Sequence, residues 1–257
     1  MNKSLSIIIP TFKACDLLEL TLASIASQDF KDLEVVVMDG YSEDGTKDVV
    51  EEYRKKNIEI VFVSEPDQGV YDAMNKGIKV AKGKWLYFLG AGDMIYKSDT
   101  LNTLAEYFDS DYQIIQGDII IKSYKNTVYR DRLSGMGLLI RNFCHQGLFY
   151  RKSVFGLLGV YSLDYPIIAD WEFNLRWFFN RKISRVYVPL IICDYLGGGL
   201  SSSIHDLKFH NDKNMIVNKL LKENPNVKNH LLVHFFNMYD SLSTKNRKRI
   251  NRYFKLE

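Results

Sequence analysis

Four polar residues between positions 67 and 93 carry the clearest chemical signal in this chain. Asp67, Asp72 and Asn75 lie in the stretch SEPDQGVYDAMNKG, and Asp93 ends the segment FLGAGD. Both segments lie at the ends of hydrophobic runs, where an α/β sheet presents its ligand crevice. Asp72 and Asn75 share one helix face, so one is expected to touch the ligand and the other to orient it. Such a cluster suits a polyanion held through a metal ion.

Asp93 is the predicted metal ligand. It follows Gly90, Ala91 and Gly92, three small residues that let a diphosphate approach the backbone. Gly92 is a predicted contact of the diphosphate. A carboxylate at this point can coordinate Mg²⁺ or Mn²⁺ through hard oxygen atoms. The cation would neutralise the negative charge of a polyanionic ligand, which is Lewis-acid assistance.

Thr11 and Asp39 follow the first two hydrophobic runs of the chain. Both are expected to point into the crevice over the carboxyl ends of the sheet, where an acid can accept hydrogen bonds from the N–H and hydroxyl groups of a ligand. Structural alternatives remain open at each position. Asp39 can form a turn with Gly40, the Thr11 hydroxyl can satisfy the backbone after Pro10, and Asp67 can cap the following helix.

The elements that must position these residues alternate between strands and helices over the first hundred positions. Hydrophobic patterning predicts strands at 5–9, 33–38, 58–63 and 85–89, and helices at 18–25, 44–56 and 70–82. Strands that are apolar almost throughout and are separated by helices are typical of a parallel sheet covered on both faces.

The pattern is less regular after Asp93. We expect helices at 99–108 and 168–180, and shorter strands at 113–115, 118–121, 127–129, 147–150 and 183–188. Three glycines at 197–199 predict a loop, and residues 197–203 could form a lid over the diphosphate or an ordinary surface loop. From His205 onward the pattern is helical. His205 is not expected to bind the metal.

Composition limits the class of protein. The 257 residues, 46% of them hydrophobic, can fill a sizeable core, and a net charge of +3 is too small to indicate general nucleic-acid binding. Three widely spaced cysteines form neither a disulfide framework nor a metal-binding pattern, which fits a reducing cytoplasm. No apolar run approaches the ~20 residues that span a bilayer, and the amino terminus does not resemble a signal peptide. The expected protein is therefore cytoplasmic, and at most peripheral on a membrane.

Three segments of the chain resemble glycosyltransferase family 2 in their order and spacing. They are SIIIPTF at 6–12, VMDGYSEDGT at 37–46 and DQGVYDAMNKG at 67–77. The chain most resembles a subgroup that assembles bacterial O-antigen, capsule or exopolysaccharide units, and the resemblance runs to about Ser203. It implies an α/β fold of the GT-A type, Rossmann-like, with a mixed central sheet and a C-terminal helical tail.

The resemblance also implies a domain organisation and an activity. The implied domain covers residues 1–204, with a nucleotide-binding half at 1–95 and an acceptor half at 96–204, and a helical extension follows at 205–257. The implied reaction is an inverting transfer from a nucleotide-diphosphate sugar, with UDP expected, to a saccharide or polyprenyl-linked acceptor. The implied contacts of the nucleotide sugar are Thr11, Asp39, Asp67, Asp72, Asn75, Gly92 and His145. His145 and Gln146 form a His-Gln pair similar to one in this subgroup, which is expected to line the donor-sugar pocket. Alternatively, His145 is only a partly buried side chain with satisfied hydrogen bonds beside a strand.

Inverting transfer needs a base because a sugar hydroxyl is a poor nucleophile until its proton is withdrawn. The segment ADWEF at 169–173 resembles the family's acid-acid-aromatic-acid segment, which implies Asp170 as the catalytic base. Glu172 is the competing carboxylate. Alternatively, both acids only stabilise the start of a helix through its dipole. Ala91 and Ala169 stand where the family usually has acids.

Other classes of function are less consistent with the sequence. A nicotinamide-dependent enzyme would need a glycine motif after the first strand, and residues 10–15 contain no glycine. A non-catalytic nucleotide-sugar binder is the second candidate, because Ala91 and Ala169 replace family acids. The segment KNRKRINRYFK at 245–255 mixes basic and apolar residues without an acid, which suggests contact with the inner membrane surface or, alternatively, a solvated helix.

Overall fold

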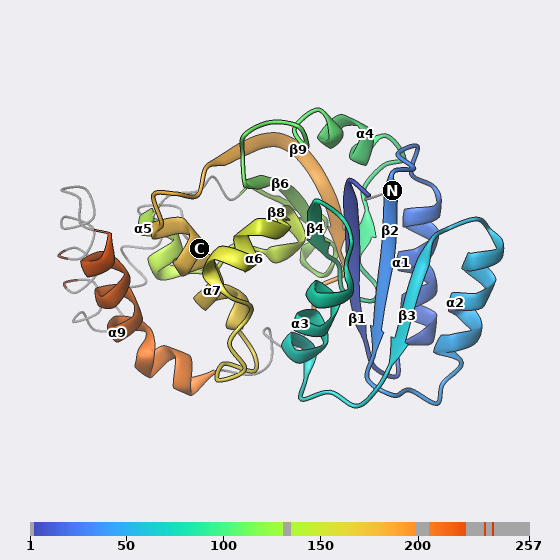
Figure 1. The fold of residues 1–257 in the computed structure, drawn as a ribbon, viewed down its shortest axis with the longest axis horizontal. Coiled ribbons are helices and arrows are strands. Elements are labelled where there is room, and N and C mark those ends of the chain that lie inside the picture. The colour runs from blue at the N-terminus through green and yellow to red at the C-terminus, as the bar shows by residue number, and fades with distance from the viewer. Residues whose placement is uncertain (1–2, 131–134, 199–205, 225–233, 235–237, 239–257) are drawn as a thin grey trace.

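Nine described strands form a single sheet in this protein (Figure 1). The structure, a computed structural model, describes residues 3–130, 135–198, 206–224, 234 and 238. The strands are β1 (Leu5–Thr11), β2 (Leu33–Asp39), β3 (Ile60–Ser64), β4 (Trp85–Phe88), β5 (Met94–Ile95), β6 (Ile114–Ile121), β7 (Thr127–Tyr129), β8 (Leu148–Arg151) and β9 (Arg185–Tyr195).

Helices connect and cover these strands. The described helices are α1 (Cys15–Ala26), α2 (Thr46–Lys55), α3 (Val70–Val80), α4 (Thr100–Ala105), α5 (Gly135–Ile140), α6 (Lys152–Leu158), α7 (Ala169–Phe179) and α9 (Leu207–Glu223), with 3-10 turns η1 (Lys122–Tyr124) and η2 (His145–Gly147). Helices α1 and α2 lie on one side of β1 to β3, and α3 lies on the other (Figure 1).

The sheet is mixed, as the resemblance implies. Its strand order is β3-β2-β1-β4-β8-β6-β9-β5, with β7 added to β6. Strands β1 to β4 are parallel, β8 is antiparallel to both β4 and β6, and β9 is parallel to β6. The carboxyl ends of the four parallel strands therefore meet the amino end of β8 at one edge, which is where the candidate residues lie.

Alternate residues of each central strand belong to two separate hydrophobic cores, one on each face of the sheet. On β1, Ile8 packs toward α3 and α7, whereas Ile7 and Ile9 pack toward α1 and α2. This is the period-2 pattern of a strand buried on both faces. Gly77 of α3 faces Ile8 so closely that a Cβ there would lie 2.5 Å from the Cγ2 atom of Ile8. The absence of a side chain therefore lets α3 lie directly on β1.

Several predicted elements differ from the observed ones. The two strands predicted at 113–115 and 118–121 form the single strand β6, with a register irregularity around Gly117, where a Cβ would collide with the side chain of Ile192. The strand predicted at 183–188 continues to Tyr195 as β9. Strand β5 and helices α5 and α6 were not predicted, because short segments carry too few residues for a periodic signal.

The carboxyl-terminal helix α9 packs against α7. Its residues Phe209, Val217 and Leu221 are buried in the same core as α7, and the ring of Phe209 lies 5.2 Å from that of Trp171. No helix in the described ranges is long and apolar enough to cross a membrane. Most of the predicted lid at 197–203, His205 and the basic segment at 245–255 lie outside the described residues. The proposed domain boundary at 204 stays a prediction.

Candidate functional site

Thr11 and Asp39 meet at the carboxyl edge of the sheet. They are direct partners in the register of β1 and β2, and their exposed fractions are 5% and 3%. Asp39 accepts hydrogen bonds at Oδ2 from the Ser42 N–H, at 2.9 Å, and the Ser64 hydroxyl, at 2.6 Å. Its Oδ1 atom and the Thr11 Oγ1 atom are buried without a hydrogen-bond partner among the described residues. Buried oxygen atoms of this kind are costly, so a ligand that supplies partners would be bound favourably.

Asp67 lies beside this pair, in the turn before α3. Its Oδ1 atom accepts a hydrogen bond from the Gly69 N–H at 2.8 Å. Gly69 itself is the N-cap residue of α3, so Asp67 stabilises the turn and not the helix cap. A cavity of about 220 Å³ opens here, lined by Pro10, Thr11, Phe12, Asp67, Gly69, Val70 and Ala73. We call it the strand-end cavity.

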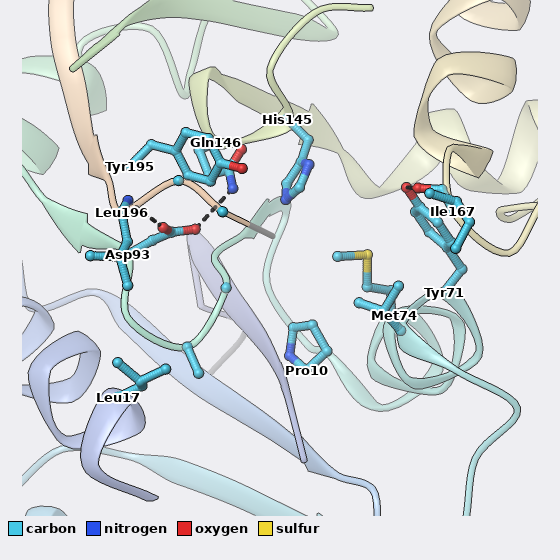
Figure 2. Close-up of a pocket in the computed structure, with 15 residues that line it drawn as sticks. Pro10, Leu17, Tyr71, Met74, Asp93, His145, Gln146, Ile167, Tyr195 and Leu196 are labelled. Carbon is cyan, nitrogen blue, oxygen red and sulfur yellow. Dashed lines mark hydrogen bonds between the residues drawn. The ribbon is translucent and has the colours of Figure 1, made fainter. Parts of the chain in front are cut away.

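A second cavity of about 370 Å³, the central cavity, shares Pro10 and Val70 with the first. It lies between α3, the end of β4, turn η2 and the end of β9. Its lining residues are Pro10, Leu17, Val70, Tyr71, Met74, Gly90, Ala91, Asp93, His145, Gln146, Ile167, Tyr195, Leu196, Gly197 and Gly198. Figure 2 shows Asp93 and Gln146 on one side of this cavity and Tyr71 and Met74 on the other.

Asp93 is held in the wall of the central cavity by two hydrogen bonds. Its Oδ2 atom accepts from the Gln146 amide at 2.8 Å, and its Oδ1 atom accepts from the Leu196 N–H at 2.9 Å (Figure 2). Burial raises the pKa of the Asp93 carboxyl, although the two hydrogen bonds oppose that rise. Gly92 precedes it with a φ of +97°, which only glycine adopts readily, and it supports the tight turn that aims Asp93.

Asp93 fits a metal site that is completed by the substrate. The described residues contain no group of three or more His, Cys, Asp or Glu side chains that could hold a metal ion. A carboxylate has about four lone-pair positions, however, and the two hydrogen bonds leave capacity for a cation. Mg²⁺ is commonly bound by one or two carboxylates together with substrate phosphates. Asp93 is therefore suited to hold a cation that also binds a diphosphate.

Asp170 lies behind the wall of the central cavity, in the first turn of α7. Its Oδ1 atom accepts hydrogen bonds from the Tyr71 hydroxyl at 2.8 Å and from the Trp171 N–H at 2.9 Å. Its Oδ2 atom accepts one from the Asn142 amide at 2.8 Å. Asp170 is 6% exposed and is not among the described residues that line the cavity.

His145 contacts Asp170 and also lines the central cavity. Its Nδ1 atom lies 3.4 Å from the Oδ2 atom of Asp170, and the ring lines the central cavity. Tyr71 and Gln146 also line it, and each contacts a predicted site residue. Gln146 was expected beside His145 at the donor-sugar pocket, whereas Tyr71 was not predicted as a site residue. The His-Gln pair at 145–146 was the sequence signal for Gln146, whereas nothing in the sequence distinguished Tyr71.

Asp72, Asn75 and Glu172 are not among the described residues that line either cavity. Asp72 accepts a hydrogen bond from the Gln68 N–H at 3.0 Å and pairs with Lys76 at 3.2 Å. Glu172 pairs with Arg176 at 2.9 Å, and burial raises the pKa of its carboxyl. These contacts are local to α3 and α7. The predicted nucleotide contacts of Asp72 and Asn75 stay predictions.

Replacing Asn75 with alanine is expected to destabilise the protein. The Asn75 amide donates to the Tyr161 carbonyl at 2.9 Å and accepts from the Tyr161 N–H at 3.0 Å, and both residues are buried. Alanine would leave two buried backbone groups unpaired, which costs about 1–3 kcal/mol each. Urea unfolding measures the loss. UDP affinity measured by calorimetry tests the nucleotide role, since a large loss of affinity in folded N75A protein would support direct contact.

The fold is that of GT-A glycosyltransferases, with the cavities at the edge where parallel strands end. The chain belongs to Glycosyl transferase family 2, whose family model matches residues 6–162, more than half of its length. It is 41% identical over 214 residues to the PGL/p-HBAD biosynthesis glycosyltransferase of Mycobacterium tuberculosis, which covers 79% of this chain and 81% of that protein. The family and the fold class expected from the sequence are thus confirmed.

Further similarities are more distant. The chain is 36% identical over 136 residues to the GalNAc(5)-diNAcBac-PP-undecaprenol beta-1,3-glucosyltransferase of Campylobacter jejuni, covering 52% of this chain and 43% of that protein. S. aureus TarS 1-349 in complex with UDP-GlcNAc superposes with a TM-score of 0.71 at 21% identity, covering 94% and 74% of the two chains. The mannosyltransferase PcManGT of Pyrobaculum calidifontis, in complex with GDP-Man and Mn²⁺, gives 0.65 at 17% identity, covering 93% and 70%.

Proposed function

We propose that this protein is an inverting, metal-dependent glycosyltransferase of bacterial surface glycolipid or polysaccharide biosynthesis. It would transfer a sugar from a UDP-sugar to a hydroxyl of a saccharide or polyprenyl-linked acceptor. The names of the relatives support the acceptor class, because one is a PGL/p-HBAD biosynthesis enzyme and another acts on an undecaprenol-linked saccharide. The solved complex of TarS with UDP-GlcNAc supports the donor class.

The observation that carries this proposal is the adjacency of the two cavities. The strand-end cavity is lined by Thr11 and Asp67, whereas Asp39 is not among its described lining residues and lies beside Thr11 in the sheet. The buried oxygen atoms of Thr11 and Asp39 that have no partner among the described residues suit a base and a ribose. The central cavity shares Pro10 and Val70 with the strand-end cavity and contains Asp93. A nucleotide seated over Thr11 would therefore extend its diphosphate and sugar toward Asp93, past the turn at Gly92.

The proposed reaction is an in-line displacement in the central cavity. The acceptor hydroxyl would attack the anomeric carbon on the face opposite the leaving diphosphate, since inversion requires that geometry. Figure 2 shows Asp93 and Tyr71 on opposite sides of the cavity. The Tyr71 hydroxyl donates a hydrogen bond to Asp170. We assign the diphosphate to the Asp93 side, and Asp170 is the proposed carboxylate on which removal of the hydroxyl proton depends.

Asp93 would hold Mg²⁺ or Mn²⁺. The bound cation would supply Lewis-acid stabilisation of the leaving diphosphate. Mn²⁺ in the complex of the Pyrobaculum calidifontis mannosyltransferase supports this proposal. Gln146 and the Leu196 N–H fix the direction of the carboxylate, so they would hold it ready for the cation.

A thermal-shift comparison of nucleotides is expected to identify the donor class. UDP and its correct sugar should stabilise the protein more with Mn²⁺ than without it, because Asp93 and the diphosphate would share the cation. A ligand present at 100 times its dissociation constant adds about 2.7 kcal/mol. GDP and UMP serve as comparison ligands. Equal shifts with UDP and GDP would contradict the choice of uracil, and equal shifts with and without Mn²⁺ would contradict the metal role.

The second candidate function is non-catalytic binding of a nucleotide sugar. It is favoured by Ala91 and Ala169, which leave Asp93 and Asp170 without the neighbouring acids usual in the family. UDP-sugar binding with no UDP release, in the presence of saccharide and polyprenyl-linked acceptors, would support it.

The proposed location is the cytoplasm, with peripheral contact between residues 245–255 and the cytoplasmic face of the membrane. No nucleic-acid partner is proposed.

A further inference from the structure

A third cavity, of about 840 Å³, lies at the edge of the sheet opposite the candidate site. It opens where the parallel strands β1 and β4 begin and where the antiparallel strand β8 ends, and it shares no described lining residue with the strand-end or central cavity. None of its described lining residues is acidic, and six are cationic: Lys3, Lys79, Lys82, Lys84, Arg151 and Lys152. We call it the basic cavity.

The charges of these side chains are only partly compensated. Lys3 and Lys84 each pair with a carboxylate, at 3.2 and 3.0 Å. Arg151 and Lys152 donate to backbone carbonyl groups, which carry no net charge. Two further acids contact lining residues at the Ser4 and Lys82 N–H groups, but neither acid lines the cavity. A hollow lined by one sign of charge concentrates ions of the opposite sign.

Lys79 and Lys82 carry the two ammonium groups that are available to a ligand. Both residues are exposed, and neither side chain forms a hydrogen bond or ion pair with another described residue. Each ammonium group has three N–H donors and no acceptor. Two like charges beside one hollow repel each other, so a bound anion would remove an unfavourable interaction.

The turn at 81–84 holds Lys82 and Lys84 in a fixed place. The Lys82 N–H donates to the buried Glu34 carboxylate at 2.5 Å, and the Gly83 N–H donates to the Ser6 hydroxyl at 2.7 Å. A Cβ at Gly83 would lie 2.4 Å from the Ser6 backbone nitrogen, so the turn packs directly on the start of β1. The backbone that carries these lysines is therefore already ordered, which lowers the entropy cost of binding.

We propose that the basic cavity binds a small soluble anion that carries several phosphate groups close together. Hydrogen bonds between ammonium groups and phosphate oxygens are charge-assisted and strong. The described lining has no aromatic side chain on which a nucleic-acid base could stack. Sites on a membrane surface combine basic residues with large apolar side chains that insert, and the largest apolar side chain in this lining is that of Val80. These features favour a compact polyphosphate ligand, and the proposal does not depend on the proposed function.

Calorimetric titration with tripolyphosphate, in the presence of EDTA and without divalent metal, tests this proposal. The wild-type protein should bind it in low salt, and added NaCl should weaken binding because the contacts are exposed to solvent. K79Q/K82Q should lower the affinity at least about tenfold, since it removes two charged donors. This variant should keep its thermal midpoint, because neither lysine side chain has a partner to lose.

Three controls locate the ligand. K47Q/K55Q removes the same charge from exposed positions of α2 outside the basic cavity, and it should leave the affinity unchanged. D93N should also retain tripolyphosphate binding, because Asp93 belongs to the central cavity. Orthophosphate should bind at least about tenfold more weakly than tripolyphosphate, because it offers one phosphate group to several ammonium groups.

The opposite results would overturn the proposal. Wild-type protein that binds no tripolyphosphate, or K79Q/K82Q protein with wild-type affinity, would exclude this ligand class from the basic cavity. Loss of binding in D93N would place the ligand in the central cavity instead. Binding to phosphatidylglycerol vesicles that requires Lys79 and Lys82, without tripolyphosphate binding, would assign the surface to a membrane. None of these results bears on sugar transfer, which the UDP and Mn²⁺ experiments test separately.

Discussion

Replacing Asp170 with asparagine is expected to lower kcat by about 100-fold or more while UDP affinity changes little. The carboxylate touches Tyr71, Asn142 and His145, and it is not among the described residues that line either cavity. An asparagine amide cannot take a proton from the acceptor hydroxyl, and its NH₂ group would meet other donors, such as the Asn142 amide. The loss therefore falls on the chemical step, which single-turnover kinetics and calorimetry with UDP would separate from binding.

Glu172 provides the matched control for Asp170. It lies two residues further along α7 and pairs with Arg176, whose guanidinium also donates to the Leu158 and Val160 carbonyls. We expect E172Q to reduce stability and to retain kcat, because the ion pair has a structural role. If a folded E172Q variant lost most of its kcat while D170N kept its kcat, Glu172 would have the catalytic role and Asp170 the structural one. Equal losses of UDP affinity and kcat in D170N would instead indicate a general defect of the site.

Replacing Asp93 with asparagine is expected to abolish the additional stabilisation that Mn²⁺ gives to the UDP complex, and to lower kcat by about 100-fold or more. Stabilisation of the charge that develops on a leaving group commonly contributes this much. The amide keeps the size of the side chain, and a flip of the Gln146 amide can preserve their mutual hydrogen bond. The reduced affinity for the cation is therefore the main change. Thermal shifts with UDP, with and without Mn²⁺, measure it directly.

Asp99 provides the control for Asp93. It is exposed, precedes α4 and makes no side-chain capping hydrogen bond to that helix. D99N changes the net charge by the same amount as D93N, so a general electrostatic effect would appear in both variants. We expect the Mn²⁺-dependent shift to persist in D99N. Retention of that shift in D93N would contradict the assignment of Asp93 as the metal ligand.

The tertiary structure alone decided which polar residues share a cavity. Asn75 had the spacing of a ligand contact, yet both ends of its amide bind the backbone of Tyr161, 86 residues away. The Gln146 amide donates a hydrogen bond to Asp93, which is 53 residues away in the sequence. Such pairs form because the antiparallel strand β8 brings turn η2 beside the end of β4. Local sequence patterns contain no information about this packing.

Local sequence determined the elements of the amino-terminal half and the edge at which its polar residues lie. Long apolar strands flanked by amphipathic helices favour burial on both faces, and a parallel sheet then places Thr11 and Asp39 together at its carboxyl edge. The direction of each side chain depended on long-range packing. Asp93 was expected to hold a cation, and its direction in the structure is fixed by hydrogen bonds from Gln146 and Leu196. His145 lines the central cavity, whereas Asp170 is not among the described residues that line it. Hydrophobic periodicity is a property of neighbouring residues, whereas these contacts arise only when distant segments pack together.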